Sequence, residues 1–301
     1  MNVHSNIARR ILTKRSLRQF TTSQNIVAIQ SEFKKQSKWF EDGWSNKSNT
    51  STTDLMTYVQ ESISNVQPIQ STDVALDVAT GTGIFARNLV HAGCNKVYGL
   101  DATSEMLEQA KTKAQEENIA ETTLELIQGD AAKLPFPNDY FDLVTSRLAI
   151  HHFSDPIESV TEMARVCKPG GRVIVVDIVS SSDDSEAQEM NRLETLRDPT
   201  HVWAFQINQL QELMKECGLA FVNEKDDASS DASVHPTFQN SMNLAGWMKA
   251  TETNQSAQLQ IERSIEIEIF ENGTKTGMNP FMVRGELSFM HNYVTLQARK
   301  V

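Results

Sequence analysis

The sequence predicts an α/β protein with a doubly wound, mostly parallel sheet of seven strands. Helices precede the sheet, and a helical cap lies near the C-terminus. Two observations predict this class. From residue 73, apolar runs of strand length alternate with amphipathic helical stretches, which is the pattern of a parallel sheet covered on both faces. The 301 residues are also enough to bury a large core.

The first element of this pattern is an apolar strand that ends in a glycine turn. Residues 74–79 are apolar apart from Asp77, and Thr80-Gly81-Thr82-Gly83 follows. Glycine lacks a Cβ, so the backbone can turn sharply here and come close to a ligand. The helix predicted directly after the turn begins with free N–H groups at the positive end of its dipole, where anions bind.

The later elements follow the same alternation. The predicted strands are 74–79, 96–100, 123–128, 141–146, 172–178, 219–223 and 286–299. The predicted helices are 84–92, 104–117, 156–167 and 206–217, with 237–250 and 256–271 in the tail. Pro169, Gly170 and Gly171 suit a tight turn into the fifth strand. Because the tail helices precede the last strand, residues 225–280 are predicted to form a cap inserted over the ligand edge of the sheet.

The N-terminal segment has a composition of its own. Residues 1–31 contain five Lys or Arg and no Asp or Glu, which is typical of an organellar transit peptide. We expect a disordered leader that directs import into the mitochondrial matrix, with plastid and cytoplasm as the alternatives. Helical patterns at 26–42 and 54–66 predict an extension over residues 32–68 that either packs passively or forms a lid. The main domain is expected over residues 69–301.

The composition argues against several classes of function. The net charge of −11 does not suit a protein that binds nucleic-acid phosphates. Cys94, Cys167 and Cys217 are widely separated and odd in number, so we expect reduced thiols and no zinc site. No apolar run approaches the ~20 residues of a membrane span, although peripheral membrane contact stays open.

Polar residues follow most of the predicted strands. In such sheets ligands bind beyond the C-terminal ends of the strands. Asp101 follows the second strand, where an acid can hydrogen-bond both hydroxyls of a ribose. Asp130 and Ala131 follow the third, and this pair suits an adenine edge because the carboxylate accepts from the amine. The later strands are followed by Arg147, His151, His152 and Asp177.

The glycine turn also fits the dinucleotide fingerprint, as Gly81-x-Gly83-x-x-Ala86. An NAD-linked oxidoreductase is therefore one alternative. Asp77 argues against it, because an anion beside the turn would repel a pyrophosphate and would suit a ligand with an ammonium group.

Five segments resemble one known family. Leu76 to Gly83 resembles motif I of the class I S-adenosylmethionine-dependent methyltransferases. Residues 97–107 are similar to the segment after it, and residues 129–136 to the adenine-binding motif. Residues 141–144 and 165–172 resemble the fourth strand and the turn into the fifth. The likeness is greatest to the type 11, UbiE/YcgJ-like branch and covers roughly residues 70–301.

The resemblance implies a role for each matching position. The turn would hold the methionine part of the cofactor, with Asp77 near its ammonium group. The implied cofactor-binding residues are Asp77, Thr80, Gly81, Thr82, Gly83, Asp101, Ala102, Met106, Gly129, Asp130, Ala131 and Arg147. The chain from Arg147 to His152 would line the reaction chamber, so the candidate catalytic residues are Arg147, His151 and His152.

The histidines are weighed for proton transfer, which is needed only when the acceptor must lose a proton. His151 and His152 are candidates because histidine titrates near neutrality, and the alternative is that they orient their loop. Arg197, Asp198 and His201 are expected to pair at a helix end, with substrate contact as the alternative. The other histidines, His4, His91, His235 and His291, are assigned to the surface or the core.

The sequence therefore predicts an S-adenosylmethionine-dependent methyltransferase that acts on a small molecule by in-line transfer. Apolar stretches in the cap favour a lipophilic acceptor such as a quinone precursor. The stretch from Arg147 to His152 departs from the quinone-methylase pattern, which argues against ubiquinone C-methylation. An alternative from another class is a non-catalytic or assembly-factor protein on the same fold.

Overall fold

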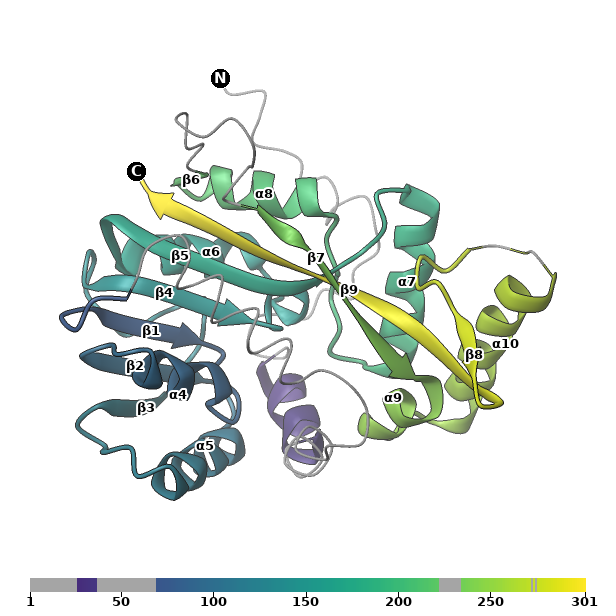
Figure 1. The fold of residues 1–301 in the computed structure, drawn as a ribbon, viewed down its shortest axis with the longest axis horizontal. Coiled ribbons are helices and arrows are strands. Elements are labelled where there is room, and N and C mark those ends of the chain that lie inside the picture. Colours follow the sequence, from purple (N-terminus) through teal and green to yellow (C-terminus); the bar gives the residue numbers. More distant parts are fainter. Residues whose placement is uncertain (1–25, 37–68, 222–233, 272, 274) are drawn as a thin grey trace.

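A single sheet runs through the computed structural model, which describes residues 26–36, 69–221, 234–271, 273 and 275–301. Its strands lie in the order β3-β2-β1-β4-β5-β9-β6 (Figure 1). The parallel strands are β1 (Val74–Val78), β2 (Lys96–Asp101), β3 (Leu124–Gln128), β4 (Phe141–Arg147) and β5 (Cys167–Val179). The sheet continues with β9 (Glu286–Lys300), which runs antiparallel to β5, and with β6 (Leu219–Ala220), which is antiparallel to β9 and so runs in the same direction as β5. The predicted doubly wound class is confirmed.

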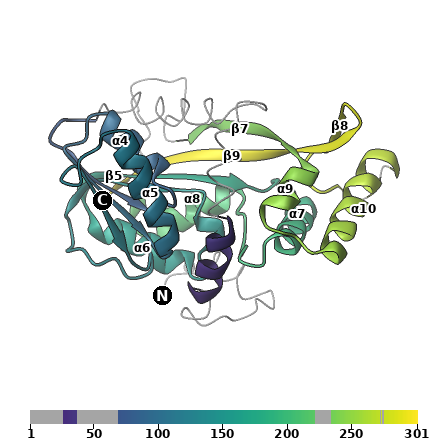
Figure 2. The same ribbon diagram turned by 90° about the horizontal axis from the view of Figure 1, so that it is seen from below.

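Helices cover both faces of this sheet (Figure 2). They are α4 (Ile84–His91) and α5 (Ser104–Glu116) on one face, and α6 (Pro156–Val166) and α8 (Ile207–Glu216) on the other. Neighbouring residues of a strand point to opposite faces. Leu143 accordingly packs in the cluster under α4 and α5, and Val144 in the cluster under α6 and α8. This double burial explains the continuous apolar runs in the sequence.

The second half of the chain builds an outer lobe beyond the end of β5. It consists of α7 (Asp184–Arg197), β7 (Val234–Asn243), α9 (Leu244–Ala250), α10 (Gln255–Glu271), β8 (Phe281–Val283) and the first half of β9. Both β7 and β8 pair with β9. Leu193, Trp247, Ile261 and Phe289 form the core of the lobe. One long strand thus belongs to the main sheet and to the outer lobe.

The outer lobe corrects three details of the prediction. The sheet has nine strands, so the expected count of seven is approximate. Residues 237–243 belong to a strand and not to a helix, because backbone pairing with β9 decides a segment whose periodicity is weak. Helix α7 was not predicted. Its buried positions include the polar residues Asn191 and Glu194. The segment therefore lacks the periodic apolar pattern from which a helix is predicted.

A helix over residues 26–36 lies between α5 and the outer lobe (Figures 1 and 2). It begins inside the segment assigned to the leader, so the boundary at residue 31 does not coincide with the end of an element. The rest of the leader lies outside the described residues. So do the predicted helix 54–66 and the part of the predicted helix 26–42 that follows residue 36. Within the described part of the chain, no helix has the length and apolar character needed to cross a membrane.

Candidate functional site

A cavity of about 250 Å³ opens at the C-terminal ends of the parallel strands. The sheet, helix 26–36 and the outer lobe enclose it. Its lining includes every predicted site residue except Asp77 and Gly83. We call the part formed by Thr80 to Thr82, Asp101, Ala102, Met106 and 129–132 the glycine-turn wall. The part formed by Arg147, His151, His152, Arg197, Asp198, His291 and Tyr293 is the histidine wall.

The two glycines of the turn serve different purposes. Both have a positive φ, 56° at Gly81 and 74° at Gly83, which favours glycine. Gly81 lines the cavity, and a Cβ there would meet nothing within 4 Å. A Cβ on Gly83 would lie 2.9 Å from the Cβ of Ala110 in α5. Gly81 therefore leaves room at the cavity, whereas Gly83 allows α4 and α5 to pack closely.

Asp77 lies behind the turn and not on the cavity wall. Its side chain accepts hydrogen bonds from Thr80 Oγ1 at 2.6 Å and from Thr145 Oγ1 at 2.8 Å. The residue is 1% exposed, and this burial raises the pKa of its carboxyl group to about 6, against the smaller effect of these hydrogen bonds. Asp77 thus holds the turn through Thr80, which does line the cavity.

Asp101 connects the end of β2 to the turn. Its two carboxylate oxygens accept from the backbone N–H groups of Gly81 and Thr103, each at 2.8 Å. Burial raises the pKa of Asp101, and these backbone donors oppose the rise. A carboxylate oxygen can accept more than one hydrogen bond, so Asp101 keeps acceptor capacity toward the cavity.

The neighbouring strand end supplies the second carboxylate of this wall. Gly129 N–H donates to the Asp101 carbonyl oxygen at 2.9 Å, which aligns the ends of β2 and β3. Asp130 follows and accepts from Ala132 N–H at 2.9 Å through one oxygen. Met106 of α5 is buried beside them on the wall. Two acids at adjacent strand ends therefore face one cavity, as predicted.

The histidine wall is a buried hydrogen-bond network. His151 Nδ1 lies 2.5 Å from Asp177 Oδ1, and His151 N–H donates to Asp177 Oδ2 at 3.2 Å. His152 Nδ1 lies 3.2 Å from the Thr200 carbonyl oxygen. Burial, together with the neighbouring His151, lowers the pKa of His152 to about 4. His152 is therefore neutral near pH 7.

The Arg197 cluster is ion-paired at a helix end, and two of its three members line the cavity. Arg197 bonds Glu194 Oε2 at 3.1 Å, and its guanidinium lies 4.8 Å from the centre of the Trp247 ring. Asp198 accepts from Thr200 at 2.6 Å. Burial would raise the pKa of Asp198, but His152, Arg197 and Thr200 together lower it to about 2. Arg197 and Asp198 also line the cavity.

The third member of that cluster does not reach the cavity wall. His201 bonds Asn191 Oδ1 at 2.8 Å, and burial lowers its pKa well below the usual value. His201 is thus a buried neutral residue of the outer lobe.

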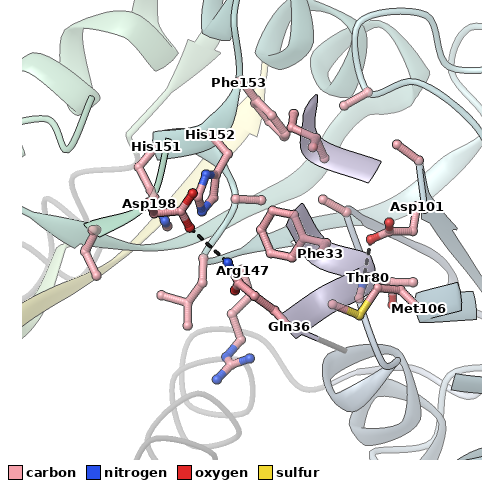
Figure 3. A pocket seen from close by; sticks show the side chains of 18 of the residues that line it. Phe33, Gln36, Thr80, Asp101, Met106, Arg147, His151, His152, Phe153 and Asp198 are labelled. Atoms are coloured by element: carbon pink, nitrogen blue, oxygen red, sulfur yellow. Dashed lines mark hydrogen bonds between the residues drawn. The ribbon is translucent and has the colours of Figure 1, made fainter. Parts of the chain in front are cut away.

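Sequence reasoning missed His291 as part of the site and left the role of the N-terminal helix open. His291 had been assigned to the surface or core, yet it lines the cavity and bonds the buried Glu194 at 2.7 Å. Helix 26–36 also reaches the wall: Phe33 points into the cavity between Asp101 and the histidines (Figure 3), and Gln36 Nε2 donates to Asp198 Oδ2 at 3.1 Å. No motif spacing could have found them, because tertiary packing brings both to the site.

Within the described ranges, no three His, Cys, Asp or Glu side chains gather at metal-binding distance. Asp198 on the histidine wall, and Asp177 and Glu194 behind it, are hydrogen-bonded to hydroxyl, imidazole or guanidinium groups.

Comparison with known proteins gives consistent matches. Residues 76–175 match the methyltransferase domain family. The uncharacterized methyltransferase YcgJ of Bacillus subtilis is 38% identical over 146 residues, which are 48% of this chain and 56% of that protein. The ubiquinone/menaquinone biosynthesis C-methyltransferase UbiE of Ruegeria sp. is 41% identical over 110 residues, 36% of this chain and 44% of UbiE. The chain thus spans about half the length of these curated relatives.

A solved structure extends the likeness beyond the matched domain. The crystal structure of YcgJ from Bacillus subtilis superposes with a TM-score of 0.69 and 26% identity, over 81% of this chain and 97% of YcgJ. The matched domain, the strand order and these relatives agree. Residues 76–175 therefore form a methyltransferase domain, and the chain is similar in sequence and in fold to the YcgJ- and UbiE-like class I methyltransferases.

Proposed function

We propose that the protein is an S-adenosylmethionine-dependent methyltransferase that acts on a small, lipophilic molecule. The observation that carries the proposal is the pair Asp101 and Asp130 on one cavity wall beside Gly81. Asp101 would accept from the ribose hydroxyls and Asp130 from the adenine amine. Among the described residues that line the cavity, the arginines are Arg147 and Arg197, and both lie on the histidine wall and not on the glycine-turn wall. The acidic glycine-turn wall suits a nucleoside without phosphates better than a dinucleotide.

The protein's part in the reaction is mainly alignment. Bound S-adenosylmethionine supplies an activated methyl group on a positively charged sulfur. The walls hold acceptor and methyl donor in one small cavity, and closure of that cavity excludes water. Helix 26–36 contributes to the closure, because Gln30 Nε2 donates to the Ala102 carbonyl oxygen at 2.8 Å while Gln36 bonds Asp198 on the opposite wall.

Apolar side chains around the histidine wall support a lipophilic acceptor. They come from the N-terminal helix, the strand ends and the outer lobe. Among them are Phe33, Leu148, Ile178, Met242 and Trp247. Such a lining stabilises an apolar body by removing it from water, at about 25 cal/mol per Å² buried.

Binding of S-adenosylhomocysteine, measured by calorimetry against NADH, tests the cofactor. We expect binding of S-adenosylhomocysteine alone. Asp130→Ala should weaken it by about 1–3 kcal/mol, the cost of losing a hydrogen bond to a charged group. Glu121→Ala is the matched control, since Glu121 is an exposed acid away from the cavity. Heat from NADH alone would overturn the proposal, and methyl transfer from labelled cofactor would exclude a non-catalytic protein.

A further inference from the structure

The contacts of His151 determine where its proton lies. The Asp177 carboxylate accepts from the backbone N–H of His151 and from that of Ile178 at 2.7 Å, and its Oδ1 lies 2.5 Å from His151 Nδ1. A carboxylate is an acceptor only, so the proton of this contact belongs to Nδ1. In the neutral ring the lone pair is then at Nε2.

The free nitrogen of His151 is available to a ligand. His151 lines the cavity. Its ring makes a hydrogen bond within the described residues through Nδ1 only. Nε2 can therefore accept a proton from a bound molecule, and Asp177 would stabilise the imidazolium that forms.

Two strand neighbours flank Asp177. Arg147 pairs in register with Val176, and Tyr293 pairs with Ile178, so one lies before and the other after Asp177 along β5. Both line the cavity. The charge of Asp177 acts on Arg147, where it opposes the lowering of the arginine pKa by burial. The guanidinium group of Arg147 and the hydroxyl group of Tyr293 therefore belong to the same cavity wall as His151, and the charge of Asp177 influences both groups.

His152 is a poorer proton acceptor than its neighbour. Its Nδ1 contacts are the uncharged carbonyl oxygen and hydroxyl of Thr200, and burial outweighs the favourable charge of Asp198, so the pKa of His152 is lowered. Its ring packs edge-on against Phe33, with ring centres 5.1 Å apart. The lowered pKa of His152 agrees with a role in shaping the cavity.

We propose that His151 is the general base of the methyl transfer, that Asp177 positions it, and that Arg147 stabilises an acceptor oxyanion. The acceptor is then a weakly acidic hydroxyl compound, a phenol or enol with an apolar body. This inference rests on the proposed function, because it assigns the acceptor of that same site. An ammonium-bearing acceptor fits less well, since Arg147 would repel it.

His151 Nε2 takes the proton of the acceptor O–H. An oxygen lone pair forms the bond to the methyl carbon as the bond from that carbon to sulfur breaks, and sulfur keeps the electron pair. The products are a methyl ether, S-adenosylhomocysteine and one proton, which His151 releases to water.

Absorption of 4-nitrophenol bound to protein saturated with S-adenosylhomocysteine tests the inference. The titration is run below the pKa of the free phenol, where the unbound probe is neutral. We expect the bound probe to show the phenolate band. His151→Gln should reduce the ratio of bound phenolate to bound phenol at least about tenfold, which corresponds to one pKa unit of the bound phenol. Asp177→Asn and Arg147→Gln should reduce it too.

His91→Gln is the matched control, because it removes an imidazole from an exposed site outside the cavity lining and should keep the band. Each variant is first shown to bind S-adenosylhomocysteine, so a failure of the cofactor assignment is seen separately.

Two results would overturn the inference while leaving the proposed function intact. One is a wild-type protein that binds S-adenosylhomocysteine and shows no phenolate band. The other is a band that survives in His151→Gln. A second measurement needs no probe: ¹⁵N spectra should show His151 protonated at Nδ1, and a proton at Nε2 of the neutral ring would contradict the assignment.

Discussion

At the scale of single residues, the buried carboxylate of Asp77 lowers the stability of the folded protein while it holds the turn that lines the cavity. Its carboxylate is 1% exposed and depends on two threonine hydroxyls for hydrogen bonds. Its pKa is raised from 3.8 to about 6, so the folded protein binds the proton more tightly than the unfolded chain. The stability that comes from this proton is complete below about pH 4 and is lost as the pH rises through 6.

Asp77→Asn should therefore stabilise the protein at neutral pH. We expect a gain of about 2–3 kcal/mol in the free energy of unfolding at about pH 7.5. The difference from wild type should vanish near pH 4, where both side chains are neutral. Urea unfolding at both pH values measures it, and a gap that stays constant with pH would contradict the account. The same variant should bind S-adenosylhomocysteine more weakly, because the turn loses its anion.

At the scale of elements, the glycine turn joins a strand, two helices and the cavity in four residues. Thr80 N–H donates to the Leu100 carbonyl oxygen at 3.0 Å, and Gly83 N–H donates to the Thr80 carbonyl oxygen at 2.9 Å. Gly83 is the N-terminal cap of α4 and touches α5. The turn therefore brings α4 and α5 into close packing, and it also lines the cavity.

Alanine at the two glycines should separate these functions. Gly81→Ala requires a positive φ without a clash, and we expect a cost of about 1–2 kcal/mol. Gly83→Ala adds the contact with Ala110, for a further cost of about 1–3 kcal/mol. Unfolding midpoints measure stability, and calorimetry measures S-adenosylhomocysteine binding. We expect Gly83→Ala to be the less stable variant and Gly81→Ala to bind S-adenosylhomocysteine more weakly. The opposite result would contradict the assignment of Gly83 to helix packing and of Gly81 to the cavity.

At the scale of the whole molecule, β9 makes the main sheet and the outer lobe one folding unit. Its second half pairs with β5 from Arg172 to Val179, and its first half carries β7 and β8. Phe289 is fully buried on this strand, with its ring centre 4.9 Å from that of Trp247. The cavity lies where the two parts meet, so the site depends on their docking.

Phe289→Ala should lower the stability of the whole molecule. Removing the ring leaves a cavity in the core of the lobe, which we expect to cost about 3–5 kcal/mol. Unfolding should stay a single transition when followed by circular dichroism and by tryptophan fluorescence. Met282→Ala is the control, since Met282 is 44% exposed and should change stability by less than about 0.5 kcal/mol. Two separate transitions would show that the lobe unfolds independently.

The sequence by itself determined the parallel sheet, the glycine turn, and Asp101 and Asp130 at the ends of their strands. These features follow from local periodicity and from the rule that parallel strands present their C-terminal ends at one edge. The same reasoning placed Arg147, His151 and His152 near the cavity but could not separate the two histidines.

Only the tertiary structure decided the rest. Gly83 belongs to helix packing because Ala110 lies against it, and Asp77 lies behind the turn because Thr80 stands in front. His151 differs from His152 because Asp177 bonds it. The contacts of Gly83 with Ala110 and of His151 with Asp177 join residues far apart in the chain, and neither composition nor spacing predicts such contacts. Residue 237 onward became a strand for the same reason, since β9 supplied the partner that a local pattern cannot specify.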